Sequence, residues 1–366
     1  MRKILSLLAA VLVFSSVQSQ SSVEVDSLDI KIGQMLMIGF AGQEVAADDP
    51  ILEEISSGMV GGVILFEKNI HPENSYINLK QLTYALKAGA PIPLTMAIDQ
   101  EGGLVNRLKT RYKFPESVSA QYLGEIDNED STRFYAEITA ATLSGLGFNV
   151  NFAPVLDLAS NPDNPIIAGK KRSYSANPKM VAKHAGIVVD AHSRVKILTV
   201  GKHFPGHGSS EADTHHGVAD VTRTWDKNEL DPYRILIDQG RLPGVMSAHI
   251  VNSNLDAEKL PGTLSKPILT DLLREDIGFK GVVFSDDMQM HAITKYYGLE
   301  TAIEKGINAG LDVLIFSNNI QQSEDRTVAN VHKIIRKLVE DGKVTMARIN
   351  QSYARVMSMK KAYFYE

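Results

Sequence analysis

Eight short apolar runs recur along the chain, and each is followed by a polar or amphipathic stretch. Most of the runs are apolar throughout, which is typical of parallel strands that are buried on both faces. The predicted strands are Gln34–Phe40, Val60–Phe66, Leu94–Asp99, Asn149–Pro154, Ile197–His203, Gly244–His249, Gly281–Asp286 and Asp312–Ser317.

The segments between these runs carry apolar residues at helical spacing. They predict helices at Glu73–Ala88, Glu129–Leu146, Pro178–Arg194, Asp226–Gln239, Lys266–Asp276, Leu299–Ala309, Ser323–Asp341 and Thr345–Phe364. Thr345 can cap the last of them, because a threonine hydroxyl accepts a hydrogen bond from the first turn.

Eight strands that alternate with helices or loops predict an α/β fold, a single (β/α)8 TIM-type barrel. The alternative is a doubly wound open sheet. It is less favoured because no glycine-rich phosphate fingerprint follows the first strand. No low-complexity linker divides the chain, so we expect one domain over residues 21–366.

The amino terminus predicts export. Arg2 and Lys3 precede an apolar run, Ile4–Phe14, and small and polar residues follow it. This order is that of a secretory signal peptide over residues 1–20, cut near Ser19 or Gln20; the alternative is an uncleaved anchor. The chain has no cysteine and no later segment of membrane length without charges. We expect a periplasmic or secreted protein without disulfides, a membrane span or a cysteine nucleophile.

Composition narrows the choice of partner. The formal charge of the 366-residue chain is -5 and no basic block occurs, which gives no support to nucleic-acid binding. Six predicted strands end in polar residues, and in a barrel these ends form the catalytic rim. The ends are Asp99, Asp157, Lys202–His203, His249, Ser285–Asp287 and Ser317–Asn319.

The residue types at these ends suit a neutral ligand rich in hydroxyl groups. Arg107, Arg172 and Lys202 supply charged donors, and Asp286 or Asp287 supplies a carboxylate. Cleavage of a glycosidic bond normally needs one carboxylate that attacks and one acid that protonates the leaving oxygen.

The acid is predicted in an unusual place, the stretch ADTHH. In D-x-H an extended backbone puts Asp213 and His215 on one side, so the carboxylate can orient the imidazole. Taken alone the spacing is common, and a loop held by side-chain hydrogen bonds is then the preferred interpretation.

A metal site is the competing interpretation of the same region. Its possible ligands are His203, His207, Asp213, His215 and His216. The histidines His203 and His207 are separated by Phe-Pro-Gly, which does not continue a helix, so the ligand spacing is weak and we expect no metal or other cofactor.

Four motifs resemble glycoside hydrolase family 3, and most closely its bacterial β-N-acetylglucosaminidase branch. They are IDQEGGLVNR, KRSYSANP, KHFPGHGSSEADTHHG and GVVFSDDMQM, in the family's order over residues 30 to 364. The resemblance implies a retaining exo-β-N-acetylglucosaminidase that forms a covalent glycosyl-aspartate and acts on cell-wall fragments, chitin-like oligosaccharides or glycans.

The resemblance also implies roles for single residues. Asp286 matches the nucleophile, His215 the acid/base residue and Asp213 its partner. Sugar-binding positions match Asp99, Arg107, Arg172, Lys202 and His203. His207 and Asp287 match positions for which loop and rim hydrogen bonding is expected.

Two departures from the family pattern stand out. Leu104 follows the glycine pair where the family usually has arginine, and the signal segment contrasts with the branch's cytosolic recycling role. Many family 3 glucosidases also carry a second α/β domain that supplies the acid, whereas here we expect the barrel to supply it.

Three other functions stay open. A β-glucosidase or dual-specificity glycosidase and a phosphorylase fit the same scaffold, and a non-catalytic sugar-binding protein belongs to another class. In each case the partner is a carbohydrate, and we expect a monomer.

Overall fold

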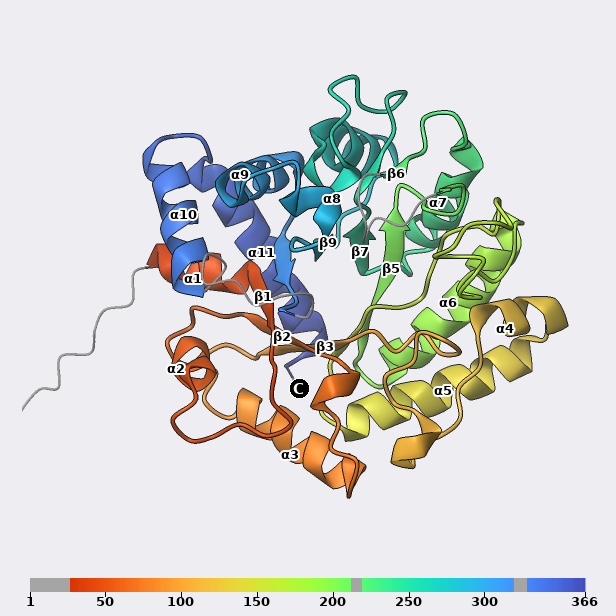
Figure 1. Ribbon diagram of the computed structural model, residues 1–366, viewed down its shortest axis with the longest axis horizontal. Helices are drawn as coiled ribbons and strands as arrows, with labels where there is room; N and C mark the ends of the chain where they lie inside the picture. The colour runs from red at the N-terminus through yellow and green to blue at the C-terminus, as the bar shows by residue number, and fades with distance from the viewer. Residues whose placement is uncertain (1–26, 212–218, 319–327, 366) are drawn as a thin grey trace, which may run out of the picture.

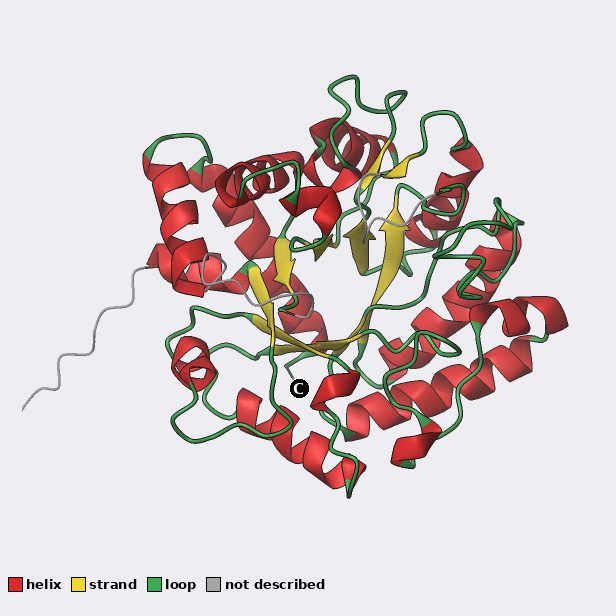
Figure 2. Cartoon of the chain, in the orientation of Figure 1, coloured by secondary structure: helices red, strands yellow, loops and turns green. Residues whose placement is uncertain are grey.

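The computed structural model describes residues 27–211, 219–318 and 328–365, and they form a closed barrel of eight parallel strands surrounded by helices (Figure 1, Figure 2). Strand β10 closes the barrel on β1, with Leu314 beside Leu36. The barrel strands are β1 Leu36–Gly39, β2 Gly62–Leu65, β3 Thr95–Ile98, β4 Val150–Asn151, β5 Leu198–Phe204, β7 Gly244–Ser247, β9 Val282–Asp287 and β10 Val313–Phe316. The closed order confirms the (β/α)8 barrel and excludes the open sheet.

Helices cover the outside of the strands. They are α1 Ser27–Gln34, α2 Pro50–Ser56, α3 Ser75–Lys87, α4 Ala120–Ile126, α5 Glu129–Gly145, α6 Pro178–Arg194, α7 Asp231–Asp238, α8 His291–Thr294, α9 Leu299–Ala309, α10 Val328–Glu340 and α11 Met346–Tyr363. Shorter or irregular helical segments are η1 Glu67–Asn69, η2 Thr110–Tyr112, η3 Lys227–Leu230, η4 Gly262–Leu264 and η5 Pro267–Asp276, and a separate strand pair joins β6 Ala219–Asp220 to β8 Ile250–Val251.

The predicted helix Asp226–Gln239 is confirmed as helical over Lys227–Asp238, but its first turn is a 3-10 helix. It is divided into η3 and α7, and α7 carries Pro232 in its first turn. Proline has no N–H and fits the first turn of an α-helix, so the α-helical part begins at Asp231, directly after the 3-10 turn. The carboxylate of Asp226 caps η3 by accepting a hydrogen bond from Asn228 N (2.8 Å).

The barrel interior is filled by apolar side chains, among them Met37, Phe152 and Phe284, and α11 adds Val356 and Met359 to the same cluster. Lys360 of α11 contacts Gln34, two residues before β1, and Gly61, the residue before β2. Helix α11 therefore covers the amino ends of the strands. The hydroxyl of Thr345 caps it through Arg348 N (3.1 Å), as predicted.

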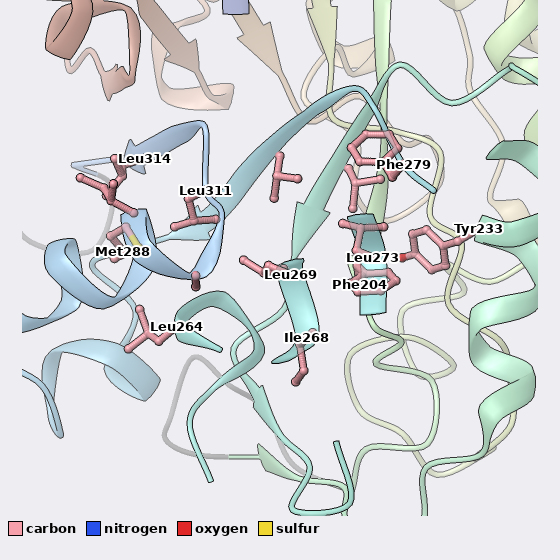
Figure 3. Packing of buried hydrophobic residues seen from close by; sticks show 14 of the residues in the cluster. Phe204, Tyr233, Leu264, Ile268, Leu269, Leu273, Phe279, Met288, Leu311 and Leu314 are labelled. Carbon is pink, nitrogen blue, oxygen red and sulfur yellow. The ribbon is translucent and has the colours of Figure 1, made fainter. Parts of the chain in front are cut away.

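A second apolar layer joins the strands to the outer helices. Phe204 of β5 packs edge-on against Tyr233 of α7, with 5.1 Å between ring centroids, and Leu273 and Phe279 lie close to them in Figure 3. This packing fixes the position of β5, and with it the polar residues at its carboxyl end. Burial of a large side chain of this kind stabilises a fold by about 1.5–3 kcal/mol.

The predicted signal segment, residues 1–20, lies outside the described residues. Of the helices that the structure describes, none has the length and apolar character needed to cross a membrane. The described ranges form the one barrel, and no second α/β domain accompanies it there.

Candidate active site

A cavity of about 490 Å³ opens at the carboxyl ends of the strands. Asp99, Arg107, Arg172, Lys202, His203 and Asp286 all line it. Its floor is apolar and includes Phe152, Met246 and Ile315 from the barrel interior. The volume is in the range of small-molecule sites. Four of the six strand ends that the sequence analysis named thus contribute residues to this one cavity, whereas Asp157 and His249 do not line it.

Asp99 follows β3 and forms ion pairs with two of the predicted sugar-binding residues. Lys202 Nζ donates to Asp99 Oδ1 (2.7 Å), and Arg107 Nη2 lies 3.6 Å from Asp99 Oδ2. Lys202 is only 1% exposed and also lies 2.7 Å from Glu101 Oε1. Buried charges need such partners because isolated ones are strongly disfavoured. The result is a preformed set of charged donors and acceptors on one wall.

Glu101 is a member of the site that sequence analysis missed. Arg172 donates to it in a two-pronged contact, from Nε at 2.8 Å and from Nη2 at 2.7 Å. Burial alone would raise the pKa of Glu101, but Arg172 and Lys202 more than offset this and hold the pKa well below its ordinary value. Arg172 and Lys202, two cations of the motifs, had no assigned counter-ion in the sequence, and this could have pointed to Glu101.

His203 is held between the carboxylate of Asp157 and the guanidinium of Arg172. Its Nδ1 lies 2.6 Å from Asp157 Oδ2, and its Nε2 lies 3.2 Å from Arg172 Nη2. A guanidinium can only donate, so Nε2 accepts and Nδ1 carries the proton that is donated to Asp157. Both ring nitrogens are engaged, which leaves neither of them for a metal ion.

Asp157 is the second acid that sequence analysis did not assign to a role. It is fully buried, and besides the His203 ring it accepts hydrogen bonds from His203 N and His207 N. Burial would raise the pKa of Asp157, but the neighbouring His203 and His207 lower it below its usual range. Asp157 therefore orients β5 and the loop after it, and it lies behind the cavity wall.

The two aspartates at the end of β9 have different surroundings. Asp287 accepts hydrogen bonds from Ser317 Oγ (2.5 Å), Ser317 N (3.2 Å) and Gln289 N (3.1 Å). Burial raises the pKa of Asp287 above its ordinary value in spite of these bonds. Asp286 is half-buried, lines the cavity and accepts a hydrogen bond from Asp287 N (2.8 Å).

His207 and Leu104 also line the cavity. His207 lines the cavity, and burial lowers its pKa to about 4, so its ring is neutral near pH 7. Leu104 lines the cavity too but is 64% exposed, which places an apolar side chain at the mouth.

Asp213 and His215, the predicted acid/base pair, lie outside the described residues, as does His216. Within the described ranges no group of three or more histidine, aspartate or glutamate side chains has a geometry that could hold a metal ion.

Comparisons with known proteins place this site in a family. Residues 27–359 match the family model described as the glycosyl hydrolase family 3 N terminal domain. A beta-hexosaminidase of Nitrosomonas eutropha is 34% identical over 299 residues, which cover 79% of this chain and 82% of that protein. Beta-hexosaminidase A of Pseudoalteromonas piscicida is 33% identical over 337 residues, 84% of this chain and 54% of that protein.

Solved structures agree. A glycoside hydrolase family 3 beta-N-acetylglucosaminidase from Paenibacillus sp. str. FPU-7 superposes with a TM-score of 0.84 at 32% identity, over 92% of this chain and 63% of that one. A beta-N-acetylhexosaminidase from Beutenbergia cavernae gives a TM-score of 0.80 at 27% identity, over 92% of this chain and 98% of that one. The resemblance seen in the motifs is confirmed, and the chain belongs to glycosyl hydrolase family 3.

Proposed function

We propose that the chain is a retaining exo-β-N-acetylglucosaminidase, a glycoside hydrolase that removes terminal β-linked N-acetylglucosamine. The observation that carries the proposal is the cavity in which Asp286 lies with the charged donors and acceptors around Asp99 and Lys202. The beta-hexosaminidase and beta-N-acetylglucosaminidase names of the relatives support this substrate class.

In the proposed reaction Asp286 attacks the anomeric carbon and forms a covalent glycosyl-aspartate. His215, oriented by Asp213, protonates the leaving oxygen and then takes a proton from the water that releases the sugar. Two displacements on one carbon retain its configuration. Support for Asp286 as nucleophile comes from its place on the cavity wall, whereas the oxygens of Asp287 accept bonds from the rim.

The charged residues around Asp99 are proposed to bind the sugar hydroxyls. Lys202 and Arg107 offer donors and Asp99 offers acceptors within one cluster. The Arg172 guanidinium contributes more through Glu101 and His203 than by itself, because Glu101 already binds two of its nitrogens. His203 contributes a ring that lines the same wall.

A panel of nitrophenyl glycosides tests the function. We expect the purified mature protein, in buffer with EDTA, to cleave the β-N-acetylglucosaminide far faster than the β-glucoside or any α-glycoside. Preference for glucoside would favour the glucosidase alternative, and sugar 1-phosphate formed in phosphate buffer would identify a phosphorylase. Calorimetric binding of N-acetylglucosamine without turnover would indicate a sugar-binding protein. Loss of activity in EDTA and recovery with zinc would reopen the metal interpretation.

We also propose that the protein is exported, so that its substrates are peptidoglycan fragments, chitin-like oligosaccharides or glycans outside the inner membrane. The support is the order of charged, apolar and small residues in the first 20 positions. Mass spectrometry of the protein from fractionated cells should find a new amino terminus near Ser19 or Gln20 in the periplasmic or culture fraction. A full-length protein in the cytoplasm would contradict it.

A further inference from the structure

The loop that follows β5 is bound by side chains from two other parts of the chain. We call residues 205–210 the rim loop. Asn164 Nδ2 donates to His207 O (2.8 Å) and Gly208 O (3.0 Å), and Asn161 Nδ2 donates to Ser210 O (3.1 Å). The carbonyl groups of the rim loop are therefore held from the segment after β4.

The amide groups of the rim loop are held by carboxylates. Asp157 accepts from His207 N (2.8 Å). Glu229 of η3 accepts from two consecutive amides, Gly208 N at 2.9 Å and Ser209 N at 3.0 Å. A charged acceptor on backbone N–H groups makes shorter and stronger bonds than a neutral one does. Glu229 is thus a two-oxygen clamp on the end of the rim loop.

The fit around Glu229 is close. Gly206 has a φ of 121°, and a Cβ at that position would lie 2.5 Å from Glu229 Oε2. Only glycine lets the backbone approach the carboxylate so closely. From the same segment as Glu229, Trp225 Nε1 donates to Pro205 O (3.1 Å), so one short stretch of chain binds both ends of the rim loop.

Ionised Glu229 has unfavourable surroundings. It is 1% exposed, Asp157 is a neighbouring acid from the segment after β4, and Tyr233 of α7 and the neutral His207 add no positive charge. Burial raises the pKa of Glu229 to about 7, and Asp157 adds to the effect. A folded pKa above the unfolded one means that stability falls as pH rises from the usual glutamate range through 7. Ionised Glu229 binds the amides of Gly208 and Ser209, but keeping this carboxylate ionised lowers the stability of the fold.

We propose that Glu229 is a positioning residue whose carboxylate, by binding the amides of Gly208 and Ser209, sets the direction in which the chain leaves the rim loop toward Asp213 and His215. Asp213 follows Ser209 by four residues and His215 by six. The proposal rests on the proposed function, because it assigns Glu229 an effect on the acid/base step. A displacement of about 1 Å at a catalytic group can cost on the order of 10²-fold in rate.

The test is Glu229→Gln, which keeps the shape but turns one acceptor oxygen into a donor that cannot face an amide N–H. We expect kcat/KM on a β-linked N-acetylglucosamine disaccharide, whose leaving group needs protonation, to fall about tenfold or more. The glycosylation rate of a dinitrophenyl N-acetylglucosaminide, which needs little protonation, should stay within about threefold. The acid limb of the disaccharide profile near pH 7 should flatten, because the clamp is then impaired at every pH.

Asp312→Asn is the matched control. Asp312 is another buried carboxylate that accepts a backbone amide, Val283 N (3.0 Å), but it lies at the opposite end of the barrel. It should lower the melting temperature and leave the ratio between the two substrates unchanged. If Glu229→Gln does not fold, Trp225→Phe removes the bond to Pro205 O and should show the same selective loss more weakly.

The outcomes separate the two proposals. Equal losses on both substrates, or no loss, in Glu229→Gln would overturn the positioning role while the wild type remains active. A wild type that cleaves neither substrate would overturn the proposed function instead.

Discussion

Asp286 and Asp287 are adjacent in sequence, yet their surroundings predict different consequences of substitution. We expect Asp286→Asn to abolish turnover of nitrophenyl and disaccharide substrates alike, because a covalent step needs its nucleophile whatever the leaving group. Asp287→Asn should retain activity and lose stability, on the order of 1–3 kcal/mol, since Ser317 and Gln289 would lose a buried acceptor oxygen. Steady-state kinetics and urea unfolding of both variants check this, and a dead Asp287→Asn beside an active Asp286→Asn would reverse the assignment.

The loss of rate on replacing His215 is expected to depend on the leaving group. His215→Ala should slow a disaccharide by ~10²- to 10⁴-fold and largely spare the first step with a nitrophenyl glycoside, because that phenol leaves without protonation. The second step then limits, and azide, which needs no base, should restore it and give a β-glycosyl azide. Product analysis with and without azide provides the measurement. Asp213→Ala should show the same pattern with smaller losses. Equal losses on both substrates in His215→Ala, without rescue by azide, would mean that His215 has a structural role only.

Leu104 gives the mouth of the cavity an apolar surface. A bound apolar leaving group would cover part of this exposed side chain. Covering about 40 Å² of apolar surface contributes on the order of 1 kcal/mol, or about fivefold in kcat/KM. Leu104→Ala should therefore lose about fivefold on a naphthyl glycoside and little on a disaccharide with a polar leaving sugar. An equal change in both kcat/KM values would contradict the contact.

Helix α11 carries a buried lysine against the amino ends of β1 and β2. Lys360 Nζ donates to Gln34 Oε1 (2.6 Å) and Gly61 O (2.9 Å), and burial lowers its pKa to about 7. Between that value and the ordinary lysine pKa, the unfolded chain binds a proton that the folded chain does not, so stability should rise with pH in this window.

The comparison with Lys360→Met isolates this effect. Relative to that variant, the wild type should gain about 2–3 kcal/mol of unfolding free energy between pH 7 and pH 9, at about 1.4 kcal/mol per pH unit. Urea unfolding of both proteins across the range provides the measurement. A difference that does not change with pH would mean that the two oxygens keep the ammonium charged throughout.

Helices and strands could be predicted from the sequence where the pattern that specifies them lies within the element itself. A parallel strand buried on both faces is a continuous apolar run, and all eight barrel strands coincide with predicted ones, as do α6 and α9. Helices α2 and α4 have seven residues each, too few for a helical period to show, and both were missed. The ends of the strands also marked most of the cavity wall.

Glu101, Asp157 and Glu229 could not be found in the same way. Their partners lie far along the chain: Glu101 binds Arg172, Asp157 binds His203, and Glu229 binds Gly208. A carboxylate in a polar loop has no local pattern that distinguishes a buried clamp from a solvated charge. These three acids acquire their roles only when the barrel brings its loops together.

At the scale of the whole barrel, a buried charge network that stabilises the fold and the candidate active site lie at opposite ends of the strands. At the amino end Asp312 is fully buried and binds Arg274 Nη2 (2.6 Å), Arg355 Nη1 (3.1 Å) and Ser352 Oγ (2.8 Å). At the carboxyl end lie the cavity and its acids. Between them the interior is packed with apolar side chains, among them Met37, Phe152 and Phe284.

Asp312→Asn should therefore weaken the fold and leave the chemistry alone. Removing one partner of a buried charge network costs about 3–5 kcal/mol, because the remaining arginines are left close together without their counter-ion. Urea unfolding should show that loss, while kcat at a temperature where the variant stays folded should match the wild type. Asp341→Asn, which breaks an exposed pair with Lys337, is the control and should change neither quantity measurably. A fall in kcat for folded Asp312→Asn would mean that the two ends of the barrel are coupled through the strands.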